Sequence, residues 1–237
     1  MTEKLFADIE YNLKFIEEQI AKAAQSSGRL REDITFLAAT KTVDAQRINF
    51  AISKGLRYIG ENRVQELMAK YDEYDLKNAQ LQFIGSLQTN KVRQIVGKVS
   101  LIQSVNSLKL AQEVSKQSQK SGVITDVLIE VNIGNEQSKS GIDKTGLEEL
   151  LLQVNTLPAL KVKGLMCIPP IYDDKTKIIK KFDEMKQLNL DICAKKIDNI
   201  DMNILSMGMS SDYYEAILSG ANMVRIGSAL FGPRLYA

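Results

Sequence analysis

Short apolar segments alternate with segments of helical pattern along the whole chain, and this alternation restricts the fold more than any other feature. Eight apolar segments have the length and composition of buried β-strands: 34–41, 57–61, 81–85, 100–105, 124–133, 160–167, 203–206 and 222–226. Eight strand–helix units at nearly regular spacing predict the α/β class and a single (β/α)8 TIM barrel, with residues 1–237 forming one domain. A doubly wound sheet remains the alternative.

A helix is predicted before the first strand. Apolar residues recur at helical spacing between residues 2 and 24, and a Ser-Ser-Gly sequence at 26–28 follows them. We therefore expect an extra N-terminal helix that packs across an end or a side of the barrel.

Polar side chains mark the starts of three later helices. Asp44 and Ser107 stand where an N-cap is expected, and Thr145 with Glu148 has the spacing of a capping box. The pattern predicts helices that begin after Asp44 and Ser107 and at Thr145.

Composition excludes several functions. Lys and Arg number 31 and Asp and Glu 29, and the charges are interspersed, so a nucleic-acid partner is not expected. No apolar segment is long enough to span a bilayer, and the charged amino terminus does not resemble a secretory signal, which predicts a cytoplasmic protein without a membrane partner. Cys167 and Cys193 are expected to be two buried thiols rather than a disulfide.

The chain contains no histidine. This excludes Ser-His-Asp and Cys-His catalysis and histidine-ligated zinc, and no metal site is expected. Any chemistry would depend on Lys, Tyr, Cys, carboxylates or a cofactor.

Lys41 ends the first predicted strand. In parallel α/β folds, ligands bind beyond the carboxyl ends of the strands, so Lys41 is the candidate reactive group. The alternative is an ordinary solvated lysine at a strand end.

The loops after the seventh and eighth strands are the usual phosphate-binding positions of a barrel. They run from Ser206 to Asp212 and from Arg225 to Gly232, and both are rich in glycine and serine. With Lys41, they suggest a Schiff base either with a phosphorylated carbonyl substrate, as in an aldolase, or with pyridoxal 5'-phosphate (PLP).

Two further residues have alternative interpretations. Arg225 could contact a pyridine nitrogen and leave it unprotonated, or it could clamp phosphate or pair with a carboxylate such as Glu61. Asn62 could contact the phenolic oxygen of PLP, or it could cap the helix that follows.

Motifs spread along the chain carry a family resemblance. They include Ala-Thr-Lys-Thr at 39–42, Ile-Gly-Glu-Asn at 59–62 and Val-Arg-Ile-Gly-Ser at 224–228. Further matching segments are 64–66, 83–85, 87–88, 90–91, 131–141, 164–166, 205–210 and 231–232. Together they resemble the pyridoxal phosphate homeostasis proteins, single-domain relatives of the alanine racemase barrel.

The resemblance implies roles for individual residues. Lys41 would carry PLP as a Schiff base, and Arg225 would face the pyridine nitrogen. The remaining residues implied at the site are Ser210, Gly227 and Ser228, which would hold the phosphate, and Asn62, Ser206 and Met207, which would line it.

The resemblance also implies a function in intracellular vitamin B6 homeostasis. The chain stops at Ala237, without the second domain that supplies a catalytic tyrosine in alanine racemase, so we expect a PLP carrier rather than an enzyme. A PLP-dependent racemase-like enzyme is the alternative, and a cofactor-free aldolase ranks below it. Expected partners are PLP and apo forms of PLP-dependent enzymes, and a monomer is expected.

The chain departs from the family pattern at three positions. It has Gln82 and Gln103 where the family often has histidine, and Asn106 where an aspartate is common. Cofactor anchoring should survive these changes, while any role of the histidines in transfer is in doubt.

Overall fold

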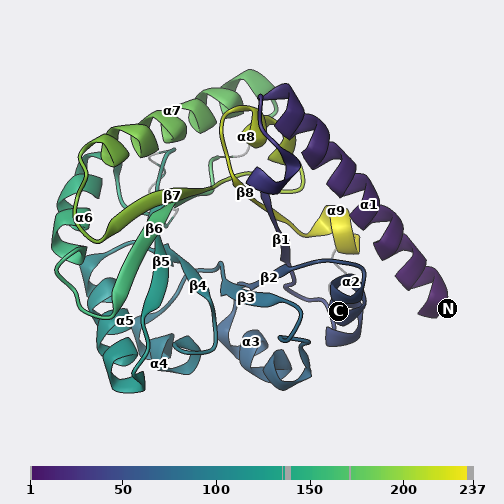
Figure 1. The fold of residues 1–237 in the computed structure, drawn as a ribbon, viewed down its shortest axis with the longest axis horizontal. Helices are drawn as coiled ribbons and strands as arrows, with labels where there is room; N and C mark the ends of the chain where they lie inside the picture. The colour runs from purple at the N-terminus through teal and green to yellow at the C-terminus, as the bar shows by residue number, and fades with distance from the viewer. Residues whose placement is uncertain (1, 135, 137–139, 171, 234–237) are drawn as a thin grey trace.

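Eight parallel strands pair in sequence order, and β8 pairs with β1 to close the barrel. The computed structural model describes residues 2–134, 136, 140–170 and 172–233 (Figure 1). The strands are β1 Thr35–Ala39, β2 Tyr58–Glu61, β3 Gln80–Phe83, β4 Leu101–Val105, β5 Thr125–Val131, β6 Leu160–Cys167, β7 Ile200–Ser206 and β8 Met223–Ile226. The predicted barrel is confirmed, and the doubly wound alternative is wrong.

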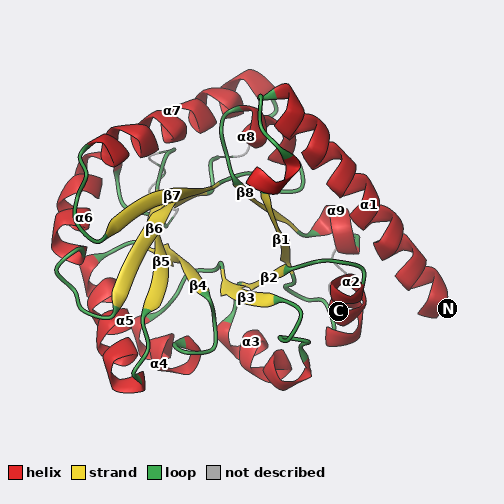
Figure 2. Ribbon diagram, in the orientation of Figure 1, coloured by secondary structure: helices red, strands yellow, loops and turns green. Residues whose placement is uncertain are grey.

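Helices surround the barrel, as Figure 2 shows. They are α1 Thr2–Ser26, α2 Ala45–Ser53, α3 Val64–Lys70, α4 Val92–Ile95, α5 Leu108–Ser121, α6 Leu147–Val154, α7 Lys175–Ala194, α8 Tyr213–Leu218 and α9 Ser228–Phe231. In the described part of the chain, no helix combines the length and apolar character needed to cross a membrane.

The predicted N-terminal helix is present as α1. Its apolar face, with Ile9, Leu13, Ile16 and Ile20, is buried, and it packs against α2, α8 and α9 (Figure 1). The Asn12 side chain also donates a hydrogen bond to the carbonyl of Leu230, with N···O at 3.0 Å. This helix therefore extends along the side of the barrel where the chain returns through β8 and α9.

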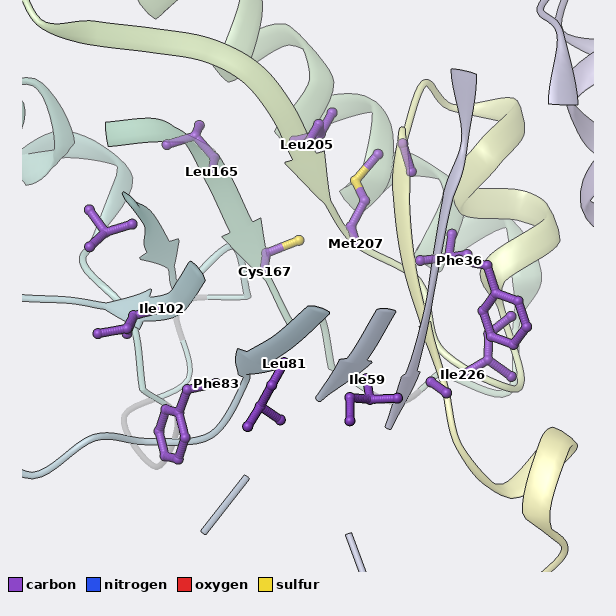
Figure 3. Close-up of a cluster of buried hydrophobic side chains, with 14 of the residues drawn as sticks. Phe36, Ile59, Leu81, Phe83, Ile102, Leu165, Cys167, Leu205, Met207 and Ile226 are labelled. Carbon is purple, nitrogen blue, oxygen red and sulfur yellow. The ribbon is translucent and has the colours of Figure 1, made fainter. Parts of the chain in front are cut away.

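Most of the core lies between the strands and the helices. Side chains such as Phe36, Ile59 and Phe83 project into it from neighbouring strands (Figure 3). Burial of this apolar surface, at roughly 25 cal/mol per Å² removed from water, is the main favourable contribution to folding.

The barrel interior has a smaller apolar cluster and a polar layer. Leu101, Leu128, Met166 and Met223 form the cluster, with Ile204 packed against it. Residues two positions apart on a strand share a face, so Gln103, Glu130, Ser206 and Arg225 follow four of these residues toward the carboxyl ends of the strands. The strand pattern therefore brings polar groups to the end where a site is expected.

Three local predictions are tested by the helix ends. Asp44 and Ser107 are N-caps whose side chains accept hydrogen bonds from Arg47 N and Leu110 N, as predicted. The predicted capping box is wrong, because Thr145 lies in a 3-10 turn, Lys144–Gly146, and α6 begins after it at Leu147. Because residues 144–146 form a 3-10 turn, Thr145 is not the N-cap of α6, and the Thr-x-x-Glu spacing does not coincide with the N-terminus of this helix.

The cysteines differ from expectation in one respect. Both are free thiols, as predicted, and Cys167 is buried at the end of β6. Cys193 is exposed near the end of α7, so its predicted burial is wrong. A helix on the outside of the barrel has one exposed face, and the apolar character of cysteine does not tell which face it occupies.

Candidate functional site

A cavity of about 1120 Å³ opens at the carboxyl ends of the strands. Its walls come from the turns after several strands and from α1. They include Ala39, Lys41, Thr42, Asn62, Ile84, Gly85, Ser86, Glu130, Ser140, Ile168, Met209, Ser210, Ser211, Arg225, Gly227 and Ser228, with Asp8, Ile9, Tyr11 and Asn12 from α1. The position is the one at which TIM barrels bind their ligands.

The structure brings six of the eight predicted site residues to this cavity. They are Lys41, Asn62, Ser210, Arg225, Gly227 and Ser228. Ser206 and Met207 do not lie on its wall: Ser206 is buried beside Arg225, and Met207 is buried in the large core.

Lys41 lies in the turn between β1 and α2. The preceding Thr40 is fully buried, whereas Lys41 is partly exposed. Thr42 has a φ of 64°, in the left-handed region that a β-branched residue seldom adopts. Lys41 is therefore held at the cavity by a turn of unusual backbone conformation.

Arg225 is buried and held in place by two hydrogen bonds. Its Nη1 donates to Ser206 Oγ at 2.6 Å, and its Nη2 donates to the carbonyl of Cys167 at 2.9 Å. Burial lowers the pKa of Arg225, and this is opposed by Cys167, Glu130 and Asp212. A guanidinium nevertheless stays protonated in proteins, so the cavity has a permanent cation on its wall.

The hydrogen bonds continue from Arg225 across the barrel interior. Ser206 Oγ donates to Gln103 Oε1 at 2.7 Å, and Gln103 Nε2 donates to Gln82 Oε1 at 2.6 Å and to Met223 Sδ at 3.1 Å. Gln82 and Gln103 are thus joined to each other and, through Ser206, to Arg225.

The predicted alternative pairing of Arg225 with Glu61 does not form. Glu61 instead pairs with Lys70, with Nζ···Oε1 at 2.6 Å.

Ser210 connects the two loops proposed to bind phosphate. Its Oγ accepts hydrogen bonds from the backbone N–H groups of Gly227, at 3.2 Å, and Ala229, at 3.3 Å. A Cβ at Gly227 would lie 3.1 Å from the carbonyl oxygen of Ala39, so glycine permits the close approach of β8 to the end of β1. The serine and glycine pattern after β7 and β8 therefore builds one continuous wall.

Asn62 is not a helix cap. The N-cap residue of α3 is Arg63, and the helix begins at Val64. Among the described residues, the buried Asn62 Oδ1 has no hydrogen-bond partner. An acceptor of this kind on a cavity wall suits a ligand that carries a donor.

Glu130 is a site residue that the sequence analysis missed. It is buried on β5, lines the cavity, and accepts a hydrogen bond from Ser140 Oγ at 2.8 Å. Burial raises the pKa of Glu130, while the Ser140 hydrogen bond and the charge of Arg225 oppose the rise. The available signal was a carboxylate within the apolar run 127–131 of β5, two positions after Leu128.

The chain belongs to the class of proteins that contain an alanine racemase N-terminal domain, because the model of that family matches residues 11–234. Within this class, the chain is 41% identical over 224 residues to the pyridoxal phosphate homeostasis protein of Aquifex aeolicus, covering 94% of this chain and 97% of that protein. The chain therefore belongs to the pyridoxal phosphate homeostasis protein family.

Solved structures agree with this assignment. The crystal structure of an unknown protein from Bifidobacterium adolescentis superposes with a TM-score of 0.93 at 32% identity, over 98% of this chain and 97% of that one. PipY of Synechococcus elongatus with PLP bound gives a TM-score of 0.79 at 31% identity, over 90% of this chain and 100% of that one. The family and the barrel predicted from the sequence are thus confirmed.

Proposed function

We propose that this protein binds PLP in the cavity as a Schiff base on Lys41 and acts in vitamin B6 homeostasis without catalysing a reaction. The observation that carries the proposal is that Lys41, Arg225 and the Ser210–Gly227 wall share one cavity. PLP needs all three features: an amine for its aldehyde, a partner for its ring nitrogen and donors for its phosphate.

Each residue then has a defined role. Arg225 faces the pyridine nitrogen, and Ser210, Gly227 and Ser228 hold the phosphate. The unsatisfied Oδ1 of Asn62 accepts a hydrogen bond from the cofactor's polar atoms. Ser206 and Met207 act from behind the wall, Ser206 by orienting Arg225 and Met207 by packing in the core.

Arg225 limits the carbanion chemistry that the site can support, which suits either a carrier or a racemase-like enzyme. Bound PLP would supply a strong electron sink only if its ring nitrogen were protonated. A guanidinium is permanently protonated and cannot accept a hydrogen bond, so Arg225 would not stabilise a protonated ring nitrogen. The site therefore offers little stabilisation to a carbanion. We further propose that the protein is a cytoplasmic monomer that delivers PLP to apo-enzymes.

The first experiment is the visible absorption spectrum of the purified protein before and after borohydride, followed by peptide mapping. Lys41→Ala is compared with Lys14→Ala, a control in which the lysine is exposed on α1 and pairs with Glu10. We expect yellow protein and a label fixed on the Lys41 peptide, lost only in Lys41→Ala. Protein that stays colourless after PLP is added would contradict the proposal.

A second experiment separates a carrier from an enzyme. A carrier should activate an apo-enzyme faster than free PLP at the same dilute concentration does. A racemase-like enzyme, the alternative function, should exchange the α-proton of an amino acid for solvent deuterium. Exchange by wild-type protein would overturn the non-catalytic part of the proposal.

A further inference from the structure

A carboxylate is buried directly beneath the turn that carries Lys41. Glu61, the last residue of β2, is fully buried, and its Oε1 accepts hydrogen bonds from Thr40 Oγ1 at 2.8 Å and Tyr74 OH at 2.6 Å. The same oxygen pairs with Lys70 Nζ at 2.6 Å. A buried carboxylate is stable only with such compensation, so Glu61 is a fixed anchor for Lys70.

Lys70 connects this anchor to the backbone around Lys41. Its Nζ donates to the carbonyl of Thr40 at 3.2 Å and to the carbonyl of Val43 at 3.0 Å. These two carbonyls lie on either side of Lys41 and Thr42 in the chain. The ammonium group therefore fixes both ends of the turn.

Glu66 holds the middle of the same turn. Its Oε1 accepts the backbone N–H of Thr42 at 2.5 Å and the ammonium of Lys70 at 2.9 Å. Glu66 and Lys70 are four residues apart on α3, so they lie on one face of the helix. The left-handed conformation of Thr42 requires such external support, because a threonine does not adopt it unaided.

None of these three charged side chains is among the described residues that line the cavity. Their hydrogen bonds reach residues 40–43, which form the turn at the cavity. A network that holds the turn of a reactive lysine by four hydrogen bonds acts on the direction of that lysine.

We propose that Lys70 and Glu66, anchored on Glu61, are positioning residues that direct the Lys41 side chain to the aldehyde of PLP. This inference rests on the proposed function and deepens it. It assigns to α3 a role in cofactor attachment, while the walls after β7 and β8 bind the phosphate independently of it.

The test compares two ligands that differ only at the reacting carbon. PLP reacts with Lys41, whereas pyridoxine 5'-phosphate has the same ring and phosphate but an alcohol in place of the aldehyde. A displaced lysine should weaken PLP binding and leave pyridoxine 5'-phosphate binding unchanged. General damage to the site should weaken both.

Glu66→Ala is the principal variant, because it removes the acceptor of the Thr42 amide and leaves the buried Glu61–Lys70 pair intact. Glu66→Gln retains an acceptor oxygen and should restore most of the wild-type behaviour. Lys70→Met removes the ammonium group that binds the carbonyls of Thr40 and Val43. Lys163→Met is the matched control, since Lys163 pairs with Asp201 at 2.8 Å through side chains that are partly exposed.

We expect affinity for PLP to fall about tenfold to a hundredfold in Glu66→Ala and Lys70→Met, as for other small misplacements of a reacting group. Affinity for pyridoxine 5'-phosphate should change less than about twofold, because this ligand has no aldehyde and forms no bond that depends on the placement of Lys41. The rate at which borohydride fixes PLP on Lys41 should also fall at saturating PLP, and circular dichroism should verify that each variant is folded.

Equal losses for both ligands, or unchanged PLP attachment in Glu66→Ala, would overturn the positioning role. The proposed function fails separately: wild-type protein would then not fix PLP on Lys41 at all.

Discussion

Two buried polar networks support the cavity, and they are built in different ways. The charged network, made of Glu61, Glu66 and Lys70, joins α3 to the turn after β1. The amide network, made of Gln82, Gln103 and Ser206, crosses the barrel interior and ends at Arg225.

The difference lies in how each network compensates charge. In the charged network, carboxylates and an ammonium neutralise one another, so removal of one partner leaves a buried charge. In the amide network, neutral dipoles surround one cation, so removal of a dipole leaves only an unpaired polar group. The first network should therefore be the more sensitive to substitution.

The largest effect is expected for Lys70→Met, which leaves Glu61 charged and buried without its cation. Breaking a buried pair costs about 3–5 kcal/mol, which corresponds to a fall in Tm on the order of 10 °C for a chain of this size. Denaturant unfolding measures the change. The double variant Glu61→Gln/Lys70→Met should recover part of the loss because it also removes the stranded charge.

Lys163→Met gives the scale for an exposed ion pair, at most about 1 kcal/mol. If Lys70→Met cost no more than this control, the charged network would not be the more sensitive one, and the comparison would fail.

A smaller loss is expected for Ser206→Ala in the amide network. The change leaves an N–H of Arg225 and the Oε1 of Gln103 without a partner, at a cost of about 1–3 kcal/mol. The same unfolding measurement applies. Ser53→Ala is the control, because the exposed Ser53 hydroxyl donates to the carbonyl of Phe50 within α2, and the loss of stability should stay within about 0.5 kcal/mol.

The third prediction concerns pH, and it follows from Glu130 at the edge of the amide network. Burial raises the pKa of Glu130 above its ordinary value of 4.5, so the folded state binds this proton more tightly than the unfolded state does. Its contribution to stability is therefore most favourable below pH 4.5, declines as pH rises through the folded pKa, and is constant above it.

Glu130→Gln should consequently be more stable than wild type at neutral pH, with the advantage disappearing in acid. Glutamine can still accept the hydrogen bond of Ser140. Unfolding curves across pH measure the difference, with Glu148→Gln, an exposed carboxylate paired with Lys195, as the control for loss of charge. An advantage that persisted unchanged below the ordinary glutamate pKa would contradict the assignment.

Sequence patterns were sufficient for the barrel and for the residues at strand ends. Apolar runs define strands, and the carboxyl ends of parallel strands meet at one edge, so Lys41 and Arg225 could be assigned to one site from chain order alone. The resemblance added Ser210, Gly227 and Ser228. These residues reach the cavity as expected, although their roles there remain predictions.

The supporting contacts could not be predicted in the same way. Lys70 is one of many lysines at helix ends, and only the packing of α3 against β2 shows that it reaches Glu61. Ser206 has the expected strand position, but it is buried beside Arg225 and does not line the cavity. Partners of buried polar groups depend on packing between distant segments, which local patterns do not contain.

The smallest effect is expected in the reactivity of the two thiols. Cys193 is exposed, whereas burial raises the pKa of Cys167 to about 12, and the Cys167 carbonyl accepts a hydrogen bond from Arg225. A thiol reagent at neutral pH should therefore label one cysteine, Cys193, in native protein, and Cys193→Ser should abolish the reaction.

Labelling of Cys167 requires that β6 open around it, because the thiolate is the reactive form and burial disfavours it. Its rate should rise in Ser206→Ala, where Arg225 loses one of its two anchors, and should not change in Ser53→Ala. Equal protection of Cys167 in wild type and Ser206→Ala would show that the amide network does not control opening at this side of the barrel.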